Sequence, residues 1–169
     1  MEFSKYQLGV DSKVIQLQSW SENRDAAAII ANQCQREIDI ISRLLDPFIF
    51  NSSDFIEAIK KLITSGKRAN IRIIVFDPET IVRNGHQIVR LAGDFSSFFE
   101  IRKASNEYKH YNQSLLMVDK TGYLHRLNSS RYEATLNFYD RKKCKALDEE
   151  FTEMWESSLA DPNLRRMRL

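Results

Sequence analysis

The sequence predicts one α/β domain in which a mixed sheet carries helices on both faces. Strand-like and helix-like segments first alternate, four strand-like segments then follow one another, and an amphipathic helix closes the chain. Alternation with helices favours parallel strands, whereas consecutive strands favour hairpins, so the sheet should contain both kinds of pairing. A length of 169 residues suits a single domain spanning 1–169.

The N-terminal part supplies the alternating segments. KVIQLQSW alternates in hydropathy and predicts a strand, and SENRDAAAII begins a helix over about 21–36, with a serine as its cap. REIDIISRLLD predicts a second strand that ends near Asp46-Pro47. NSSDFIEAIKKLITSG predicts a helix capped by Ser52 or Ser53.

The remaining elements follow from the same patterns. IRIIVFDP is a nearly continuous β-branched run, typical of a strand buried on both faces, and ETIVRNGHQIVRLAG predicts one helix despite Gly85. FFEIRKA, SLLMVDK, GYLHRL and YEATLNFYD predict four strands, two of them joined as a hairpin by Lys120-Thr121-Gly122. RKKCKALDEEFTEMWESSL predicts the closing helix.

The charge composition argues against a protein whose whole surface binds nucleic acid. The 25 basic and 23 acidic side chains leave a net charge of +2, far from the surplus of a wholly basic nucleic-acid-binding surface. GKRANIR and DRKKCK are short basic runs, and Tyr108, Tyr111 and Tyr123 could stack on bases. We interpret the runs as solvated helix ends and the tyrosines as core side chains, so nucleic acid is not an expected partner.

The expected compartment is the cytoplasm. The sequence contains no run of 18 apolar residues that could span a membrane, and the first residues lack the apolar core of a signal peptide. Cys34 and Cys144 fall on predicted helices, where we expect reduced thiols that pack in the core. ADPNLRRMRL should form a short solvated tail.

The element order, and above all the last third of the sequence, resembles a phospholipase D-like domain. Four passages carry the likeness: EIDIISRLLDPFIFNSSDFIEAIKKLITSGKRANIRIIVFD, FFEIRK, SLLMVDKTGYLHRL and YEATLNFYDRKKCKALDEEFTEMWE, which together span roughly 36–156. The chain is also similar to an uncharacterised bacterial branch of these domains that is sometimes attached to an acetyltransferase domain. The resemblance implies a three-layer α/β/α sandwich with a mixed sheet.

The catalytic signature of that family is altered in this chain. Family members carry His-x-Lys-x-x-x-x-Asp, in which the histidine attacks phosphorus and the lysine binds the phosphate. Aligning Asp119 with the acid places Asn112 at the histidine position and Ser114 at the lysine position. The resemblance therefore implies a degenerate domain that serves as a binding or interaction module. The alternative is a weak phosphodiesterase or phosphatidyltransferase that uses His110 or His125.

Ligands of open α/β sheets bind beyond the carboxyl ends of the strands, which places Arg43 and Asp77 near the start of the hairpin. The candidate ligand-binding residues are Arg43, Asn112, Ser114, His125, Arg126 and Asn137. Arginines bind anions through paired N–H groups, so Arg43 with Arg126 or Arg131 could hold a small phosphorylated ligand. Alternatively, these arginines pair internally with Asp39, Asp46 or Glu133.

Other expectations concern metals, cofactors and assembly. No histidines lie at HxH or HxxxH spacing, and no glycine-rich phosphate loop is present, so we expect neither a metal nor a cofactor. His86 should be a hydrogen-bonded structural group, and Asp119 should brace the hairpin. Single-motif members of the resembling family look like half-sites that pair about a twofold axis, which predicts a homodimer.

Overall fold

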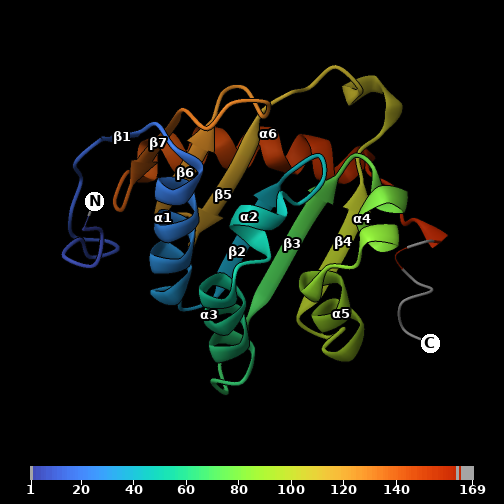
Figure 1. The fold of residues 1–169 in the computed structure, drawn as a ribbon, viewed down its shortest axis with the longest axis horizontal. Helices are drawn as coiled ribbons and strands as arrows, with labels where there is room; N and C mark the ends of the chain where they lie inside the picture. The colour runs from blue at the N-terminus through green and yellow to red at the C-terminus, as the bar shows by residue number, and fades with distance from the viewer. Residues whose placement is uncertain (1, 163, 165–169) are drawn as a thin grey trace.

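The computed structural model describes residues 2–162 and residue 164, and its centre is a seven-stranded sheet in the order β1-β7-β6-β5-β2-β3-β4 (Figure 1). β2, β3 and β4 pair in parallel, and the other neighbours are antiparallel. The strands are β1 (Ile15–Leu17), β2 (Glu37–Ile41), β3 (Asn70–Val75), β4 (Phe99–Lys103), β5 (Ser114–Val118), β6 (Gly122–Arg126) and β7 (Ala134–Asn137). The predicted mixed sheet is confirmed.

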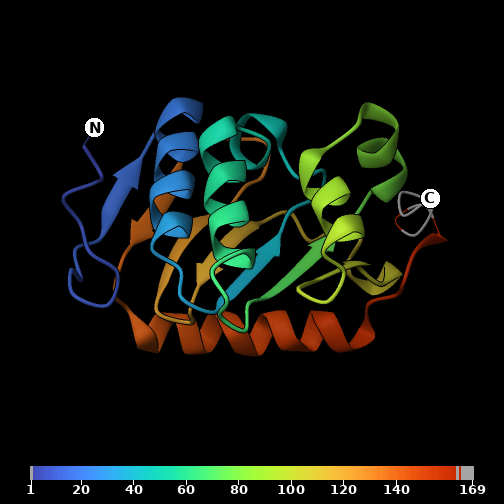
Figure 2. The same ribbon diagram turned by 90° about the horizontal axis from the view of Figure 1, so that it is seen from below.

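The helices divide unequally between the two faces of this sheet. α6 (Arg141–Ser157) crosses one face alone, which we call the α6 face, and the other α-helices cover the α1 face (Figure 2). These are α1 (Trp20–Asn32), α2 (Pro47–Phe50), α3 (Ser53–Ile63), α4 (Pro78–Asn84) and α5 (Gln87–Asp94), and a 3₁₀ turn η1 (Asn106–Tyr108) lies between β4 and β5. The expected three-layer arrangement is thereby confirmed.

Each face of the sheet has its own hydrophobic cluster. Along β5, Leu116 and Val118 belong to the cluster that includes α1 and α3, whereas Leu115 and Met117 pack with Phe151 of α6. Successive side chains of a strand point to opposite faces. The position of a residue in β5 or β6 therefore fixes the face on which its side chain lies.

The first helix begins and ends earlier than predicted. Ser19 and Glu22 form a capping box: the Ser19 hydroxyl accepts from Glu22 N at 3.1 Å, and Glu22 Oε1 accepts from Ser19 N at 3.2 Å. The helix ends at Asn32 and not near residue 36, because the backbone N–H groups of Gln35, Arg36 and Glu37 donate to the carboxylate of Asp119. Cys34 consequently lies in the connection between α1 and β2 and not on a helix as expected.

The Asp46-Pro47 pair starts a helix that sequence patterns did not predict. Asp46 Oδ1 accepts from Phe48 N at 3.0 Å, and Pro47 occupies the first helical position, where its missing N–H costs nothing. Ser52 then caps α3 by accepting from Phe55 N at 3.2 Å, as one of the two predicted caps.

The single helix predicted around Gly85 is wrong, because the chain breaks there into α4 and α5. Gly85 has φ of +73°, in the left-handed region that favours glycine. His86 follows as the cap of α5: its Nδ1 accepts from Ile88 N at 3.1 Å, and its Nε2 donates to Leu45 O at 2.9 Å. Burial lowers the pKa of His86, which keeps Nδ1 free to accept. The structural role expected for this histidine is confirmed.

A buried ion pair lies between the sheet and α6. Asp39 of β2 is 2% exposed, and its Oδ1 accepts from Arg72 Nε at 2.9 Å. Arg72 also lies 3.8 Å from Asp148 of α6 and covers the ring of Phe151. Burial raises the pKa of Asp39 to about 6, although Arg72 opposes that shift. The carboxylate is therefore costly to keep charged.

Cys34 and Cys144 are both free and buried, in agreement with reduced packing thiols. Within residues 2–162 and 164, no helix has both the length and the apolar character needed to cross a bilayer. Most of the predicted tail, including Arg165, Arg166 and Arg168, lies outside the described residues.

Candidate functional site

The two altered positions of the signature, Asn112 and Ser114, lie at the edge of the sheet where β2, β3 and β4 end, which we call the strand-end edge. Ser114 is the first residue of β5 and is buried. Its partner in register is Arg126, the last residue of β6. Directly paired residues of antiparallel strands point to the same face, so both side chains lie on the α1 face.

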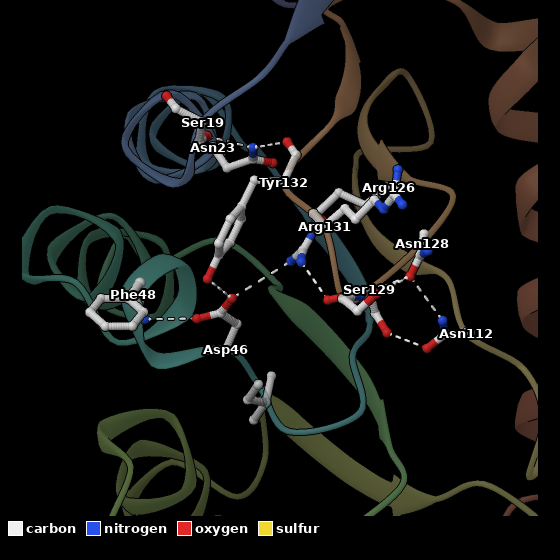
Figure 3. A network of polar contacts seen from close by, with 12 residues as sticks. Ser19, Asn23, Asp46, Phe48, Asn112, Arg126, Asn128, Ser129, Arg131 and Tyr132 are labelled. Carbon is white, nitrogen blue, oxygen red and sulfur yellow. Dashed lines mark hydrogen bonds and ion pairs between the residues drawn. The ribbon is translucent and has the colours of Figure 1, made fainter.

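Arg126 fills the space beside Ser114 and is held there by the loop from β6 to β7 (Figure 3). Its Nε donates to Arg131 O at 2.8 Å, and its Nη2 donates to Ser129 O at 2.6 Å. The guanidinium also lies 4.7 Å from the centre of the Tyr132 ring. Arg126 is only 4% exposed, so these contacts replace water.

Asp46 supplies the opposite charge to this cluster. Its Oδ2 lies 3.7 Å from Arg126 Nη1 and accepts from the Tyr132 hydroxyl at 2.9 Å. Burial lowers the pKa of Arg126, and Asp46 opposes that shift. Burial and this hydrogen bond raise the pKa of Tyr132. For Arg126, the alternative of internal pairing with Asp46 is confirmed, and an incoming anion would have to displace that carboxylate.

Asn112 ties two loops of the strand-end edge together (Figure 3). Its Nδ2 donates to Asn128 Oδ1 at 3.0 Å, and its Oδ1 accepts from Ser129 Oγ at 2.5 Å. The backbone carbonyl of Asn112 also accepts from Ser129 N at 2.7 Å. An amide at this position joins the loops but offers no nucleophile.

Arg43 holds the connection between β4 and β5. Its Nη2 donates to Lys109 O at 2.6 Å and to Tyr111 O at 2.7 Å, and its guanidinium lies 4.6 Å from the centre of the Phe76 ring. Phe76 in turn stacks on Tyr111 with ring centres 6.0 Å apart. Asp77, expected nearby, donates its backbone N–H to Arg43 O at 3.2 Å and caps α4 with its side chain.

The two histidines of the catalytic alternative are not brought together with Ser114. His125 precedes Arg126 in β6 and therefore points to the α6 face, where its Nε2 donates to Gln113 Oε1 at 2.8 Å. Burial, and then Lys143, lower the pKa of His125 to about 4. His110 is exposed in the connection between β4 and β5.

Asn137 and Asp119 lie at the opposite edge of the sheet. Asn137 Nδ2 donates to Ser12 O at 3.3 Å, and its Oδ1 accepts from Tyr139 N at 3.0 Å. Asp119 accepts from three backbone N–H groups, at 2.7 to 2.9 Å. Of the six predicted ligand-binding residues, Ser114 and Arg126 therefore lie together on the α1 face of the strand-end edge, and Asn112 bonds the loop that also holds Arg126. Arg43 lies at the same edge but contacts Phe76, which packs against the cluster of the α6 face.

A surface that sequence reasoning dismissed forms around the turn of the β5–β6 hairpin, at the edge we call the hairpin edge. Asp119 N donates to Glu37 O, Asn70 N donates to Arg36 O, and Asp140 N donates to Thr121 O, at 2.8 Å each. These bonds bring the starts of β2, β3 and α6 to one edge. The hairpin-edge cations are Arg36, Lys67, Arg68, Lys120 and Arg141.

These cations follow the order of the strands. Arg141 follows β7, Lys120 joins β6 to β5, Arg36 precedes β2, and Lys67 and Arg68 precede β3. Neighbouring strands lie about 4.8 Å apart, so the row extends over about 19 Å. Lys120 lies 3.5 Å from Asp148. The other four form no ion pair with any described residue.

The basic runs GKRANIR and DRKKCK contributed Lys67, Arg68 and Arg141 to this row. The sequence could not show that these two runs lie at the same edge of the sheet, because their positions depend on the order of the strands. Elsewhere in the described chain, no cluster of three or more His, Cys, Asp or Glu side chains could hold a metal ion.

Comparison with known proteins places the chain in a family and in a fold. The family model described as a domain of unknown function, DUF7931, matches residues 19–167. The chain belongs to the DUF7931 family. No curated protein sequence matches this DUF7931 chain.

Solved structures share its fold at low sequence identity. TrmBL2, an archaeal chromatin protein described with a novel mode of DNA binding, superposes with a TM-score of 0.65 at 17% identity over 89% of this chain and 54% of its own. Nuc from Salmonella typhimurium, a phospholipase D family member, gives 0.61 at 15% identity over 88% and 97%. Phosphatidylserine synthase from Haemophilus influenzae Rd KW20 gives 0.62 at 18% identity over 93% and 41%.

These likenesses show that the DUF7931 chain has a phospholipase D-like fold. The chain spans about half the length of TrmBL2 and less than half the length of the synthase. The likenesses also overturn one expectation. Nucleic acid was not expected as a partner, but the same fold occurs in a DNA-binding chromatin protein. The physical reason for the error is that net charge averages over a whole surface, whereas four cations that form no ion pair with a described residue lie along one edge here.

Proposed function

We propose that this DUF7931 domain is a phospholipase D-like module without catalytic activity that binds nucleic acid through its phosphates. One observation carries the proposal: the cation beside Ser114 is neutralised by Asp46, while four cations that form no ion pair with a described residue lie at the opposite edge. Phosphoryl transfer depends on positioned charge that stabilises the transition state, and removal of one such group costs on the order of a hundredfold to a thousandfold in rate.

The direction in which the His125 side chain points supports the absence of catalysis. His125 points away from Ser114, and Asn112 cannot act as a nucleophile. A phosphodiesterase that uses His110 is the remaining enzymatic alternative. Turnover of a bis-aryl phosphate that disappears in His110→Ala would overturn our proposal.

The binding half of the proposal is supported by the DNA-binding neighbour of the same fold and by the hairpin-edge cations. The test is a fluorescence anisotropy titration of labelled oligonucleotides, single-stranded and duplex, in about 50 mM salt. We expect saturable binding that weakens steeply as salt is added, because bound cations release condensed counterions. Absence of binding to both oligonucleotides would refute the proposal.

Self-association and a cytoplasmic location stay predictions. Neither is needed for the proposed activity, because the cations of the hairpin edge all come from one chain.

A further inference from the structure

The hairpin edge contains an open hollow of about 540 Å³. Its volume lies within the range of small-molecule sites, about 300 to 1,000 Å³. The side chains that matter for recognition are Gln7, Leu8, Gln35, Arg36, Glu37 and Arg141. They come from the N-terminal segment, the connection from α1 to β2 together with the first residue of β2, and the start of α6.

Two guanidinium groups bound this hollow, and neither is neutralised. Arg36 and Arg141 are exposed and form no ion pair with any described residue. Asp119 also lines the hollow, but its oxygens accept from the backbone N–H groups of residues 35–37. The arginine side chains therefore keep their donors available for an anion.

The wall that carries Leu8 is fixed before any ligand arrives. Gln33 Oε1 accepts from Leu8 N at 2.7 Å, and Gln33 Nε2 donates to Tyr6 O at 2.9 Å. Leu8 also packs over Gly122, where an added Cβ would lie 2.8 Å from Leu8 Cδ1. A preformed apolar side chain beside two cations saves a ligand the cost of ordering the site.

The chemistry of the hollow matches the parts of a nucleotide. Arginines bind phosphate oxygens, an aliphatic side chain supports the face of a base, and carboxylates and amides recognise hydroxyls and base edges. Glu37 supplies the carboxylate and Gln7 the amide. Lys67, which donates to the Gln35 side chain, continues the row of cations beyond the hollow.

We propose that the hollow holds one unpaired nucleotide of a single-stranded nucleic acid, with its phosphate between Arg36 and Arg141 and the adjoining phosphates along Lys67 and Arg68. This inference rests on the proposed function and adds the surface and the kind of strand. A duplex cannot fill the hollow, because its bases stay stacked and paired inside the helix. Single strands should therefore bind more tightly than duplexes of equal length.

The test compares two double variants that change charge equally. Arg36→Glu with Arg141→Glu alters the hollow, and Arg90→Glu with Lys109→Glu alters exposed, unpaired cations elsewhere. We expect the first pair to weaken binding of a single-stranded 12-mer about tenfold or more in about 50 mM salt, and the second by less than about twofold. Equal melting temperatures would show that both variants fold.

A photo-crosslink locates the base directly. An oligonucleotide that contains 5-bromouracil should form adducts with residues 7–9 or 35–37, identified by mass spectrometry of peptides. Adducts confined to the strand-end edge, at residues 104–113, would refute the location.

The outcomes separate the two proposals. If the unmodified protein binds no nucleic acid, the proposed function fails. If it binds but Arg36→Glu with Arg141→Glu binds equally well, only the location fails. Equal affinity for duplex and single strand would overturn the unpaired nucleotide, and equal affinity for a free nucleoside monophosphate would overturn the requirement for a strand.

Discussion

Arg126 shows how a buried arginine at a strand end can resemble a ligand-binding group. Its donors are used by two carbonyl groups of its own loop, and its charge is offset by Asp46. The sequence identified Arg126 and a set of possible acidic partners, but it did not show which of these acids pairs with Arg126. That choice depends on α2, the short helix that positions Asp46 and that no sequence pattern revealed.

Replacement of Arg126 should destabilise the fold severely. Arg126→Ala leaves Asp46 without its counter-charge and two carbonyls without donors, so we expect a loss of about 3 to 5 kcal/mol in the free energy of unfolding. Urea denaturation of the variant measures this loss. Arg131→Ala, which removes an exposed neighbouring side chain, serves as the control and should change stability by less than about 0.5 kcal/mol. A loss of similar size in both variants would contradict the account.

Asp39 should give stability a pH dependence opposite to that of most carboxyl groups. Its pKa is raised to about 6, so this group favours folding most below about pH 4, and that contribution is lost as pH rises through 6. Asp39→Asn imitates the neutral form. We therefore expect the stability of Asp39→Asn relative to the parent protein to rise by about 2 to 3 kcal/mol between about pH 4 and 7.5.

The measurement for Asp39 is urea denaturation at a series of pH values. Asp25→Asn, on an exposed part of α1, provides the matched change of charge and should show no such trend. A pH-independent difference for Asp39→Asn would show that the buried carboxyl titrates normally.

At the scale of elements, α6 has its charges arranged against its own dipole. Basic side chains occupy its first turns and acidic ones its later turns: Arg141, Lys142, Lys143 and Lys145, then Asp148, Glu149, Glu150, Glu153 and Glu156. Helix dipoles favour the reverse order. The arrangement lowers helix stability and is consistent with a role for its basic end in binding anions.

Reversal of one of these charges should separate stability from binding. Lys142→Glu places an acid in the first turn of α6, so we expect the free energy of unfolding to rise by about 0.5 to 1 kcal/mol. The same change should weaken binding of a single-stranded oligonucleotide. Denaturation and anisotropy on one sample measure both effects, and Lys109→Glu, in a loop, should produce neither. A variant that is less stable and binds as before would contradict this interpretation.

Most elements could be predicted because their local patterns match their environment. IRIIVFDP became β3, buried on both faces, and the closing helix placed Cys144, Leu147, Phe151 and Met154 in the core. The break at Gly85 escaped because helical spacing of apolar residues continues on both sides of it. The side to which His125 points depends on the exact limits of β6, and the meeting of the basic runs depends on strand order. Neither is a local property of the sequence.

For the whole molecule, two opposite edges of one sheet carry different electrostatic character. At the strand-end edge, Arg43 and Arg126 serve the protein itself, whereas at the hairpin edge four of the five cations lack an acidic partner among the described residues. Since the sheet separates the two edges, changes at one should leave binding at the other intact.

The dependence of binding on salt reports how many of these cations meet phosphates. About four contacts to a single strand predict a slope of about −3 in a plot of log K against log salt concentration. Arg36→Glu with Arg141→Glu should reduce the magnitude of that slope by about 1.4. Anisotropy titrations at several salt concentrations provide the measurement, and a slope near zero would exclude a phosphate-based interface.

The pairing of Ser114 with Arg126 also limits how the phospholipase D signature could be restored in this chain. Asn112→His with Ser114→Lys would restore the residues of the signature. The new ammonium group would, however, lie beside the guanidinium of Arg126, which is already paired with Asp46. Two like charges would then compete for Asp46, and the β6–β7 loop would lose its anchor if Arg126 yielded. The β6–β7 loop would first have to be redesigned, so restoring the signature requires removal of the contacts that Arg126 makes with this loop as well as the return of a histidine and a lysine.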